Sequence, residues 1–313
     1  MADLEYTKLS FEDLKGWADD DHRAALDVYG ATAPDALGDA AMIAPVARGF
    51  FEQNFTPVLI EDGADMVFTG YYEPEFAASR TPDSTYCHPI YAKPSDLVPE
   101  TPYHTRREIE EGEVLADQGL ELAWLSDPVD VFFLQVQGSG RLRLPDGDMM
   151  RVGFSAKNGH PYTSIGKTLI ARGEFLPEDV SPEAIRAWIA ENETAGRALL
   201  WENESYVFFK EITEVPTDHG PLGAMGHSVT AGRSIAVDPD ITPLGAPVWI
   251  EAHGVTPINR LMIAQDIGSA IKGAQRADIF FGSGDAAGKL AGQMNDGGRM
   301  IVLMPLQMAE GLG

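Results

Sequence analysis

The sequence predicts a mainly β protein of two domains, with helices near its N-terminus. The chain has 313 residues, which exceeds the roughly 250–300 residues at which one hydrophobic core stops growing, although one large domain is the alternative. The stretch from Lys93 to Pro102 holds three prolines and marks a domain boundary or linker. After Gly220 glycine is frequent and the expected strands are short, a pattern typical of a small barrel.

The composition excludes several kinds of partner. Lys and Arg number 23 against 48 Asp and Glu, and the formal net charge is −25. Because binding to nucleic acid requires a cationic surface that replaces phosphate counterions, we expect neither nucleic acid nor anionic membrane surfaces as partners. The sequence contains no run of about 18 consecutive apolar residues, so no membrane span is predicted. Met1 to Glu5 lack the basic and apolar regions of a secretion signal.

The first expected elements are helices, followed by a strand. Ser10 to Asp13 resembles a capping box ahead of an amphipathic run, which predicts a helix start. Apolar residues three and four apart predict a helical segment from Asp35 to Phe51, which Pro45 starts, kinks or breaks. Met66 to Tyr72 is aromatic and β-branched and predicts a strand, which Pro74 ends.

The middle of the chain mixes strands, turns and short helices. Val129 to Gln137 is predicted to be a strand that Gly138 stops. The turn Pro145 to Asp148 indicates a hairpin over residues 131–155. Ser181, followed by proline, is expected to cap a helix. The helices expected here are Ile165–Arg172 and the Ser181 helix to Asn192, and the next strand is Ser205–Lys210.

Short strands dominate the last third of the sequence. Glycine and proline turns separate them, which again indicates a small barrel. The expected elements are strands at Ser234–Val237, Pro247–Glu251, Leu261–Gln265, Asp278–Phe281 and Met300–Met304, and a helix at Ala286–Gln293.

Several kinds of catalytic and metal site are excluded. The seven histidines are scattered, and no pair four residues apart lies beside a Glu, so a zinc-protease motif is absent. Neither a Gly-x-Ser-x-Gly elbow nor a phosphate-binding Walker loop occurs. The single cysteine, Cys87, excludes a disulfide within the chain, and we expect it to be a half-buried structural thiol. We expect no metal or other cofactor.

Three aspartates near the C-terminus are candidates for acid catalysis. Asp266 follows an apolar run, Asp278 begins another, and Asp285 follows a Gly-Ser-Gly turn. An Asp at the edge of an apolar strand is partly desolvated, which raises its pKa and lets it remain protonated as a general acid. Cleavage of a glycosidic bond needs such an acid. The alternative is that these aspartates cap turns or helices, and Asp285 fits a helix cap well.

Two patches supply groups typical of carbohydrate sites. Gly70 to Pro74 contains two tyrosines as aromatic platforms, and Gln137 to Gly140 supplies amide and hydroxyl groups. Both follow or end a predicted strand, where loops build sites on rigid scaffolds. Packing and turn formation are the alternative roles.

As a set, these motifs resemble those of the membrane-bound lytic murein transglycosylase A (MltA) family. The matching stretches keep the family's order over roughly residues 67 to 304, although each alone is weak. Glu204 is a departure, because proline is common there in the family. The stretches are Thr69–Pro74, Pro89–Tyr91, Val136–Gly140, Lys157–Tyr162, Ser164–Lys167, Tyr206–Phe209, Gly232–Asp238, and Asp266–Gly268 through Lys272 and Gly273 to Asp278.

The resemblance implies a discontinuous architecture. A double-psi β-barrel is expected from residues 1–95 and 211–313, with a second β-barrel domain inserted at residues 96–210. The C-terminal third looks like the "3D" module, whose three aspartates match Asp266, Asp278 and Asp285. A groove between the two domains is expected to hold the glycan.

The resemblance also implies a reaction. Such enzymes cleave the β-1,4 bond between N-acetylmuramic acid (MurNAc) and N-acetylglucosamine (GlcNAc) of peptidoglycan without water, as carbon–oxygen lyases, and leave 1,6-anhydro-MurNAc ends. Hydrolases usually need two carboxylates, but one suffices when the MurNAc 6-hydroxyl is the nucleophile. Asp278 matches the catalytic acid, and Asp266 matches a neighbour that orients the site or tunes its pKa. Substrate contacts are implied for Tyr71, Tyr72, Gln137, Gly138, Ser139, Gly140, Lys157, Asn158, Tyr162, Ser164, Lys272 and Asp285.

The implied partners are peptidoglycan glycan strands, with cell-wall synthesis or division proteins as further candidates. A monomer is expected, in the periplasm or at the outer membrane of a Gram-negative bacterium. The sequence has no N-terminal lipidation cysteine, so it does not itself support membrane anchoring.

Two other functions stay open at this point. A non-catalytic glycan-binding protein, like the expansin-type barrels, would release no product from peptidoglycan. An aspartic protease is the second, because Leu261 to Ser269 loosely resembles an active-site strand of that class. That chemistry needs two aspartates sharing a proton, and the chain has no second apolar-Asp-Thr/Ser-Gly stretch.

Overall fold

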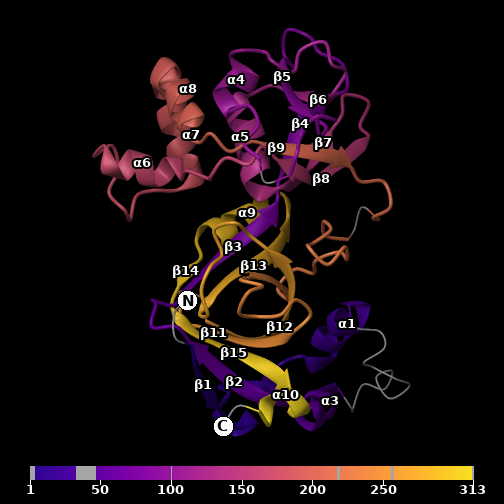
Figure 1. The fold of residues 1–313 in the computed structure, drawn as a ribbon, viewed down its shortest axis with the longest axis vertical. Coiled ribbons are helices and arrows are strands. Elements are labelled where there is room, and N and C mark those ends of the chain that lie inside the picture. Colours follow the sequence, from indigo (N-terminus) through magenta and orange to yellow (C-terminus); the bar gives the residue numbers. More distant parts are fainter. Residues whose placement is uncertain (1–3, 33–46, 100, 217–218, 255–256, 312–313) are drawn as a thin grey trace. The chain divides into compact units, whose positions relative to one another are not determined.

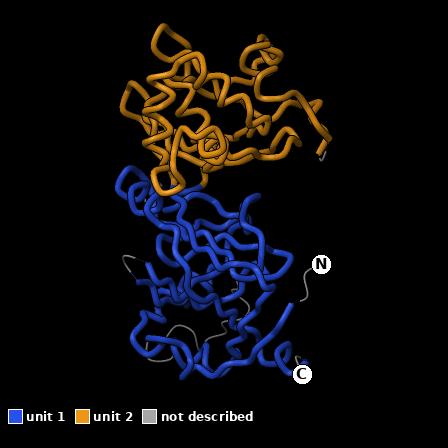
Figure 2. Tube along the Cα trace, turned by 90° about the vertical axis from the view of Figure 1, so that its left-hand side faces the viewer, with its two compact units in different colours: residues 1–72, 215–313 blue, residues 73–214 orange. Residues whose placement is uncertain are grey.

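The computed structural model describes residues 4–32, 47–99, 101–216, 219–254 and 257–311 (Figure 1). Pro45 and most of the helical segment predicted from Asp35 to Phe51 lie outside these residues. The chain divides into two compact units (Figure 2). Unit one comprises residues 1–72 and 215–313, and unit two comprises residues 73–214.

Unit one is built on a nine-stranded sheet. Its strands are β1 (Glu5–Lys8), β2 (Phe55–Glu61), β3 (Val67–Glu73), β10 (Ser234–Val237), β11 (Pro247–Ala252), β12 (Ile258–Ile267), β13 (Arg276–Ser283), β14 (Asn295–Asp296) and β15 (Gly298–Pro305). The hydrogen-bonded order is β1-β2-β15-β11-β12-β10-β13-β3-β14, so the described sheet has two ends. β10 runs parallel to β12 and antiparallel to β13. The five strands predicted for the last third of the sequence are therefore confirmed.

Side-chain alternation along the central strands builds two cores in unit one. Val248 and Ile250 of β11 belong to one core, whereas Trp249 between them belongs to the other. Because successive strand residues point to opposite faces, β11 is buried on both faces. The helices α1 (His22–Thr32) and α3 (Ala47–Asn54) supply Leu26 and Phe51 to the Trp249 core.

Helix ends in unit one follow the local sequence. The N–H of Ser10 donates to the Asp13 carboxylate at 2.8 Å, so the predicted capping box is confirmed ahead of the 3-10 helix η1 (Phe11–Asp13). The predicted C-terminal helix is α9 (Gly284–Gly292). Its N-cap is Ser283, so the cap expected at Asp285 is wrong, and Asp285 lies in the first turn, where the helix dipole favours negative charge. Two further short elements are η2 (Trp17–Asp19) and α10 (Leu306–Ala309).

Unit two combines a six-stranded sheet with helices. The strands are β4 (Glu75–Ser79), β5 (His88–Tyr91), β6 (Glu121–Leu125), β7 (Ser139–Arg143), β8 (Met149–Lys157) and β9 (Val207–Glu211), in the order β5-β6-β4-β7-β8-β9. The helices are α4 (Arg106–Glu110), α5 (Pro128–Gln137), α6 (Ile165–Ala171), α7 (Pro182–Glu191) and α8 (Glu193–Glu202). The antiparallel β7–β8 pair confirms the predicted hairpin, and Ser181 caps α7 as predicted. None of the helices in the described ranges has the length and apolar character needed to cross a membrane.

The strand predicted from Val129 to Gln137 is wrong, because these residues form α5. The Asp127 side chain accepts a hydrogen bond from the N–H of Val129 at 2.8 Å, and Pro128 lies in the first turn. Gly138 ends the helix in the left-handed region, with a φ of 76°. The helix contributes to two separate cores of unit two. A helix buried on two sides shows no single apolar stripe, which explains why its pattern looked like a strand.

Cys87 is exposed, so its predicted half-buried position is wrong. Its N–H donates to the carbonyl oxygen of Leu125 at 3.2 Å, which extends the β5–β6 ladder by one residue. Strand alternation then turns the thiol outward, because the next residue, His88, is the one that faces the protein.

Candidate active site

Asp266 and Asp278 lie on the two strands that flank β10. Ala236 of β10 is the register partner of both Asp266 on β12 and Asp278 on β13. Neighbouring strands are roughly 4.8 Å apart, so the two Cα atoms are about 10 Å apart across β10. β3 lies beside β13 in the sheet order and supplies Thr69 and Tyr71, which are two residues apart and therefore share a face.

Asp278 is partly buried and bonded to Thr69. Thr69 Oγ1 donates to Asp278 Oδ1 at 2.6 Å. Burial is the main reason that the pKa of Asp278 is raised, whereas the Thr69 hydrogen bond and the charge of Arg276 lower it and the charge of Asp266 raises it. The net effect is a raised pKa, which a general acid working near neutral pH requires.

Asp266 has a different environment. Its Oδ2 accepts from the Tyr71 hydroxyl at 3.0 Å, and its Oδ1 accepts from the N–H groups of Ala224 and Ile267 at 3.0 and 2.9 Å. Burial raises the pKa of Asp266, and the pKa stays raised although all three hydrogen bonds lower it. Because an ionised carboxylate accepts at both oxygens while a protonated one must donate through one, Asp266 is the better site for negative charge. Asp278 is the better site for a proton.

The two tyrosines of the Thr69–Pro74 motif have separate surroundings. The Tyr71 ring packs against Phe280 with a centroid distance of 5.1 Å. Burial and the nearby Asp266 raise the pKa of Tyr71, so its hydroxyl remains a neutral donor. Tyr72 faces α9, where a Cβ on Gly288 would lie 2.8 Å from the Tyr72 ring.

Gly70 lets β3 approach α9 closely. A Cβ at this position would lie 2.6 Å from the Phe281 ring and 2.7 Å from the Cα of Ala291, and real Cβ atoms essentially never come within 3.0 Å of other atoms. The glycine lies between Thr69 and Tyr71, the residues that hold the two carboxylates. The absence of a side chain at Gly70 therefore allows β3 to pack against α9 directly beside the two carboxylates.

In the described part of the chain, no hydrogen bond or ion pair joins Lys272 or Asp285 to Asp266 or Asp278. Lys272 Nζ donates to Asp238 Oδ1 at 2.8 Å and lies 3.5 Å from Asp240 Oδ2. Asp285 is exposed in the first turn of α9. Their contact with substrate stays a prediction.

The remaining predicted substrate contacts lie in unit two, and several have structural tasks there. Gly138 ends α5, and Gly140 has no room for a Cβ beside Leu134. Ser164 caps α6 by accepting from the N–H of Lys167 at 3.3 Å. Contact with substrate stays a prediction for Gln137, Gly138, Ser139, Gly140, Lys157, Asn158, Tyr162 and Ser164.

Asn158 is fully buried and holds three chain segments together. Its Nδ2 donates to the carbonyl oxygens of His104 and Glu204 at 2.9 and 2.8 Å, and its Oδ1 accepts from the N–H of Tyr206 at 2.8 Å. This geometry gives Asn158 a structural task. It also explains why glutamate is tolerated at position 204, since Asn158 bonds only to the backbone there.

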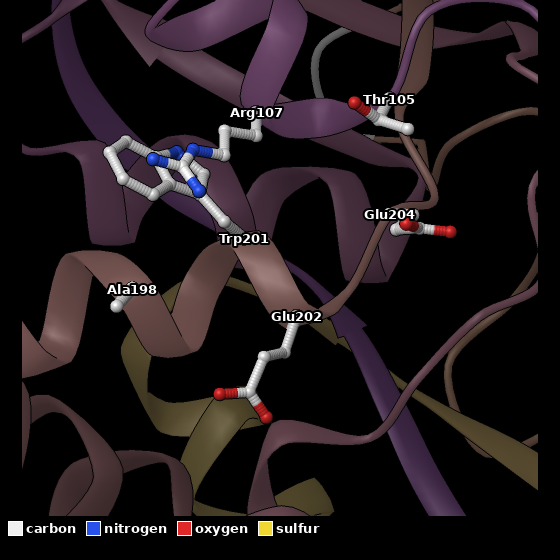
Figure 3. A pocket seen from close by; sticks show the side chains of 6 residues that line it. All are labelled: Thr105, Arg107, Ala198, Trp201, Glu202 and Glu204. Atoms are coloured by element: carbon white, nitrogen blue, oxygen red, sulfur yellow. The ribbon is translucent and has the colours of Figure 1, made fainter.

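A surface cavity of about 500 Å³ on unit two lies among other residues (Figure 3). The Arg107 guanidinium lies 5.0 Å from the centroid of the Trp201 ring, and Trp201 Nε1 donates to Glu110 at 3.0 Å. The acidic side chains of the lining are engaged as well, Glu202 with Arg172 and Glu204 with His160. The lining residues are Thr105, Arg107, Ala198, Trp201, Glu202 and Glu204, none of which was a predicted site residue.

Comparison with known proteins identifies the family. The family model of the MltA specific insert domain matches residues 67–210, and that of the 3D domain matches residues 233–304. Membrane-bound lytic murein transglycosylase A of Escherichia coli K12 is 38% identical over 257 residues, which cover 77% of this chain and 67% of that protein. The chain belongs to the MltA family.

Other MltA-family proteins agree in sequence and fold. The Vibrio cholerae membrane-bound lytic murein transglycosylase A is 36% identical over 250 residues, which cover 75% of this chain and 64% of that protein. The chain thus spans about two thirds of the length of these curated relatives. A membrane-bound lytic murein transglycosylase from Agrobacterium tumefaciens has 34% identity and a TM-score of 0.91, covering 99% of this chain and 100% of that chain. The E. coli MltA structure with bound chitohexaose has 31% identity and a TM-score of 0.76, covering 93% and 90%.

Sequence reasoning selected two of the four side chains around the acid and missed Thr69 and Arg276. Thr69 lies two residues before Tyr71 in a predicted strand, so the period of two was a signal that both side chains share a face. Arg276 lies two residues before Asp278 and carried the same signal.

Proposed function

We propose that this protein is a lytic transglycosylase that cleaves the MurNAc–GlcNAc β-1,4 bond of peptidoglycan, with Asp278 as its single general acid and base. The observation that carries the proposal is the contrast between the two carboxylates. Burial raises the pKa of both carboxyl groups, but Asp266 accepts three hydrogen bonds and is suited to remain ionised, whereas Asp278 accepts only one among the described residues, from Thr69. Two carboxylates whose environments differ in this way are typical of glycosidic-bond cleavage.

In the proposed reaction Asp278 protonates the glycosidic oxygen as the bond to the MurNAc anomeric carbon breaks. The MurNAc 6-hydroxyl attacks that carbon, and its proton passes to the ionised Asp278, which restores the acid. Asp266 stabilises the positive charge that develops on the sugar ring. The products are a GlcNAc hydroxyl end and a 1,6-anhydro-MurNAc end, and no water is consumed.

We further propose that unit one is the catalytic domain, with a double-psi barrel topology, and that unit two is the inserted domain. The 3D match at residues 233–304 falls within unit one, and the insert match at residues 67–210 nearly coincides with unit two, which supports this division. For its location we propose the bacterial envelope, at the periplasm or outer membrane. The curated relatives from V. cholerae and E. coli are named membrane-bound, and peptidoglycan lies in that compartment.

Digestion of purified peptidoglycan sacculi followed by mass spectrometry tests the reaction. We expect anhydro-ended fragments, which are lighter by one water than the reducing ends that a hydrolase leaves. The Asp278→Asn variant should lose at least about 100-fold in rate, because an amide cannot transfer the proton. Asp65→Asn, the same change at an exposed aspartate of unit one, is the matched control and should behave as the wild type.

Three outcomes would contradict the proposal in different ways. Reducing ends would indicate a hydrolase. Binding to sacculi without any released fragment would indicate a non-catalytic glycan-binding protein. Full activity of Asp278→Asn would remove Asp278 from the role of the acid.

A further inference from the structure

Arg276 is linked to the acid through Thr69. It lies on β13 two residues before Asp278 and is partly buried. Its Nη2 donates to Thr69 Oγ1 at 2.9 Å, and its Nη1 donates to the backbone oxygens of Val67 and Ala277 at 3.1 and 2.7 Å. Three acceptors on β3 and β13 therefore hold the planar guanidinium in one orientation.

This arrangement determines the direction of the hydrogen bond to the acid. A guanidinium has donors only, so the Thr69 hydroxyl accepts from Arg276. The hydroxyl has one proton, and within the described residues Asp278 is its acceptor. Thr69 Oγ1 and Asp278 Oδ1 are 2.6 Å apart, which leaves room for one hydrogen between them. When Asp278 is protonated, its own proton therefore lies on Oδ2.

We propose that Arg276 is a positioning residue that orients the Thr69 hydroxyl and thereby makes Asp278 present its transferable proton on Oδ2. This role rests on the proposed function, in which Asp278 is the acid. It differs from a purely structural role because it acts on one proton at a stated atom.

The charges around Asp278 determine the direction in which loss of Arg276 should move the pKa of Asp278. The groups that face Asp278 are Thr69 and Tyr71 from β3, Arg276 from β13 and Asp266 from β12. Burial and Asp266 raise the pKa of Asp278, whereas Thr69 and Arg276 lower it. Removal of the Arg276 charge therefore raises the pKa further. Because catalysis needs the protonated acid, activity should then persist to higher pH.

The first test is the pH dependence of kcat/KM on sacculi. In Arg276→Met we expect the basic limb to move to higher pH by about one unit, the lower end of the effect of a charge at this range. Arg276→Lys keeps the charge and should leave the limb near its wild-type position. Arg48→Met is the matched control, because Arg48 is exposed on α3 and pairs with Glu52. An unmoved limb in Arg276→Met would overturn the role.

The second test asks whether Arg276 acts through Thr69. Thr69→Val keeps the side-chain shape and removes the hydroxyl, so Arg276 can no longer act on Asp278 through a hydrogen bond to Thr69. We expect Arg276→Met to lower kcat by a smaller factor in the Thr69→Val background than in the wild type. A structural role would lower kcat equally at every pH, and the two changes would multiply independently.

An NMR titration of the Asp278 carboxyl carbon in the full chain separates this role from the proposed function. The pKa of Asp278 should be higher in Arg276→Met, and also in Thr69→Val, than in the wild type. An unchanged titration in both variants would overturn the inference even if the enzyme is active. Wild-type protein that releases no anhydro fragments would overturn the proposed function alone, since the titration does not depend on turnover.

Discussion

Gly70→Ala is expected to destabilise unit one and to disturb the site at the same time. The added Cβ would lie 2.6 Å from the Phe281 ring and 2.7 Å from the backbone of Ala291. The ring has some freedom to turn, but the Ala291 Cα moves only if β3 and α9 separate. Forcing a methyl group into such a contact typically costs about 1–3 kcal/mol. For a domain of this size that corresponds to a fall in Tm of roughly 2–12 °C.

The same displacement should reach catalysis, because Thr69 and Tyr71 flank Gly70. A shift of about 1 Å in a positioned group costs up to roughly 100-fold in rate. Calorimetry and sacculus digestion measure the two effects on one preparation. Gly292→Ala is the matched control, since a Cβ there meets nothing within 4 Å at the end of α9, and its stability should rise by zero to about 1 kcal/mol. If Gly70→Ala matched the wild type in Tm, the reasoning from close packing would be refuted.

Three further predictions concern the carboxylates and the corrected helix. The pKa of Asp278 is higher in the folded than in the unfolded state, so the folded protein loses stability as pH rises from the unfolded pKa through the folded pKa. Asp278→Asn should therefore be more stable than the wild type at pH 7. In a pH series of Tm values, this gain should vanish below the unfolded pKa of about 3.9. Tyr71→Phe keeps the ring but removes a donor to Asp266, so the pKa of Asp266 should rise and the free energy of unfolding should fall by about 1 kcal/mol. NMR titration measures the first effect and urea unfolding the second. An unchanged pKa of Asp266 would contradict the contact. Asp127→Ala removes the cap that bonds Val129 and should cost unit two about 1 kcal/mol in urea unfolding, while Asp127→Asn should be nearly neutral; equal losses in both would argue against the cap.

Local patterns predicted much of the fold, and they failed where a pattern fitted two structures. β10 and β11 were found because short β-branched runs between glycine and proline turns have few other solutions. The run Val129 to Gln137 is equally β-branched and aromatic, yet it is a helix. The deciding signals were Asp127 and Pro128 just before it, which are helix-start residues, so capping chemistry would have separated the two readings.

The candidate site shows a second limit of sequence reasoning. Asp266 and Asp278 stood out only through the ordered motifs, because chemistry alone left several carboxylates equivalent. Thr69 is separated from Asp278 by 209 residues, and no local pattern shows that β3 lies beside β13. Asn158 shows the reverse case, in which a motif residue that looked suited to a sugar is fully buried and bonded to three backbone groups on two other segments.

The strand order of unit one also has a consequence for how the protein is made. β15 lies between β2 and β11, and β3 lies between β13 and β14, so strands synthesised early await partners synthesised much later. Figure 1 shows β2, from the N-terminal part, beside the yellow β15. Unit two is one continuous stretch and has all its strands once residue 214 has emerged from the ribosome. Thr69 and Tyr71, in contrast, meet their carboxylates only after residues 258–283 have been synthesised. A nascent chain, or one cut before residue 298, therefore lacks β15, the interior strand that pairs with both β2 and β11.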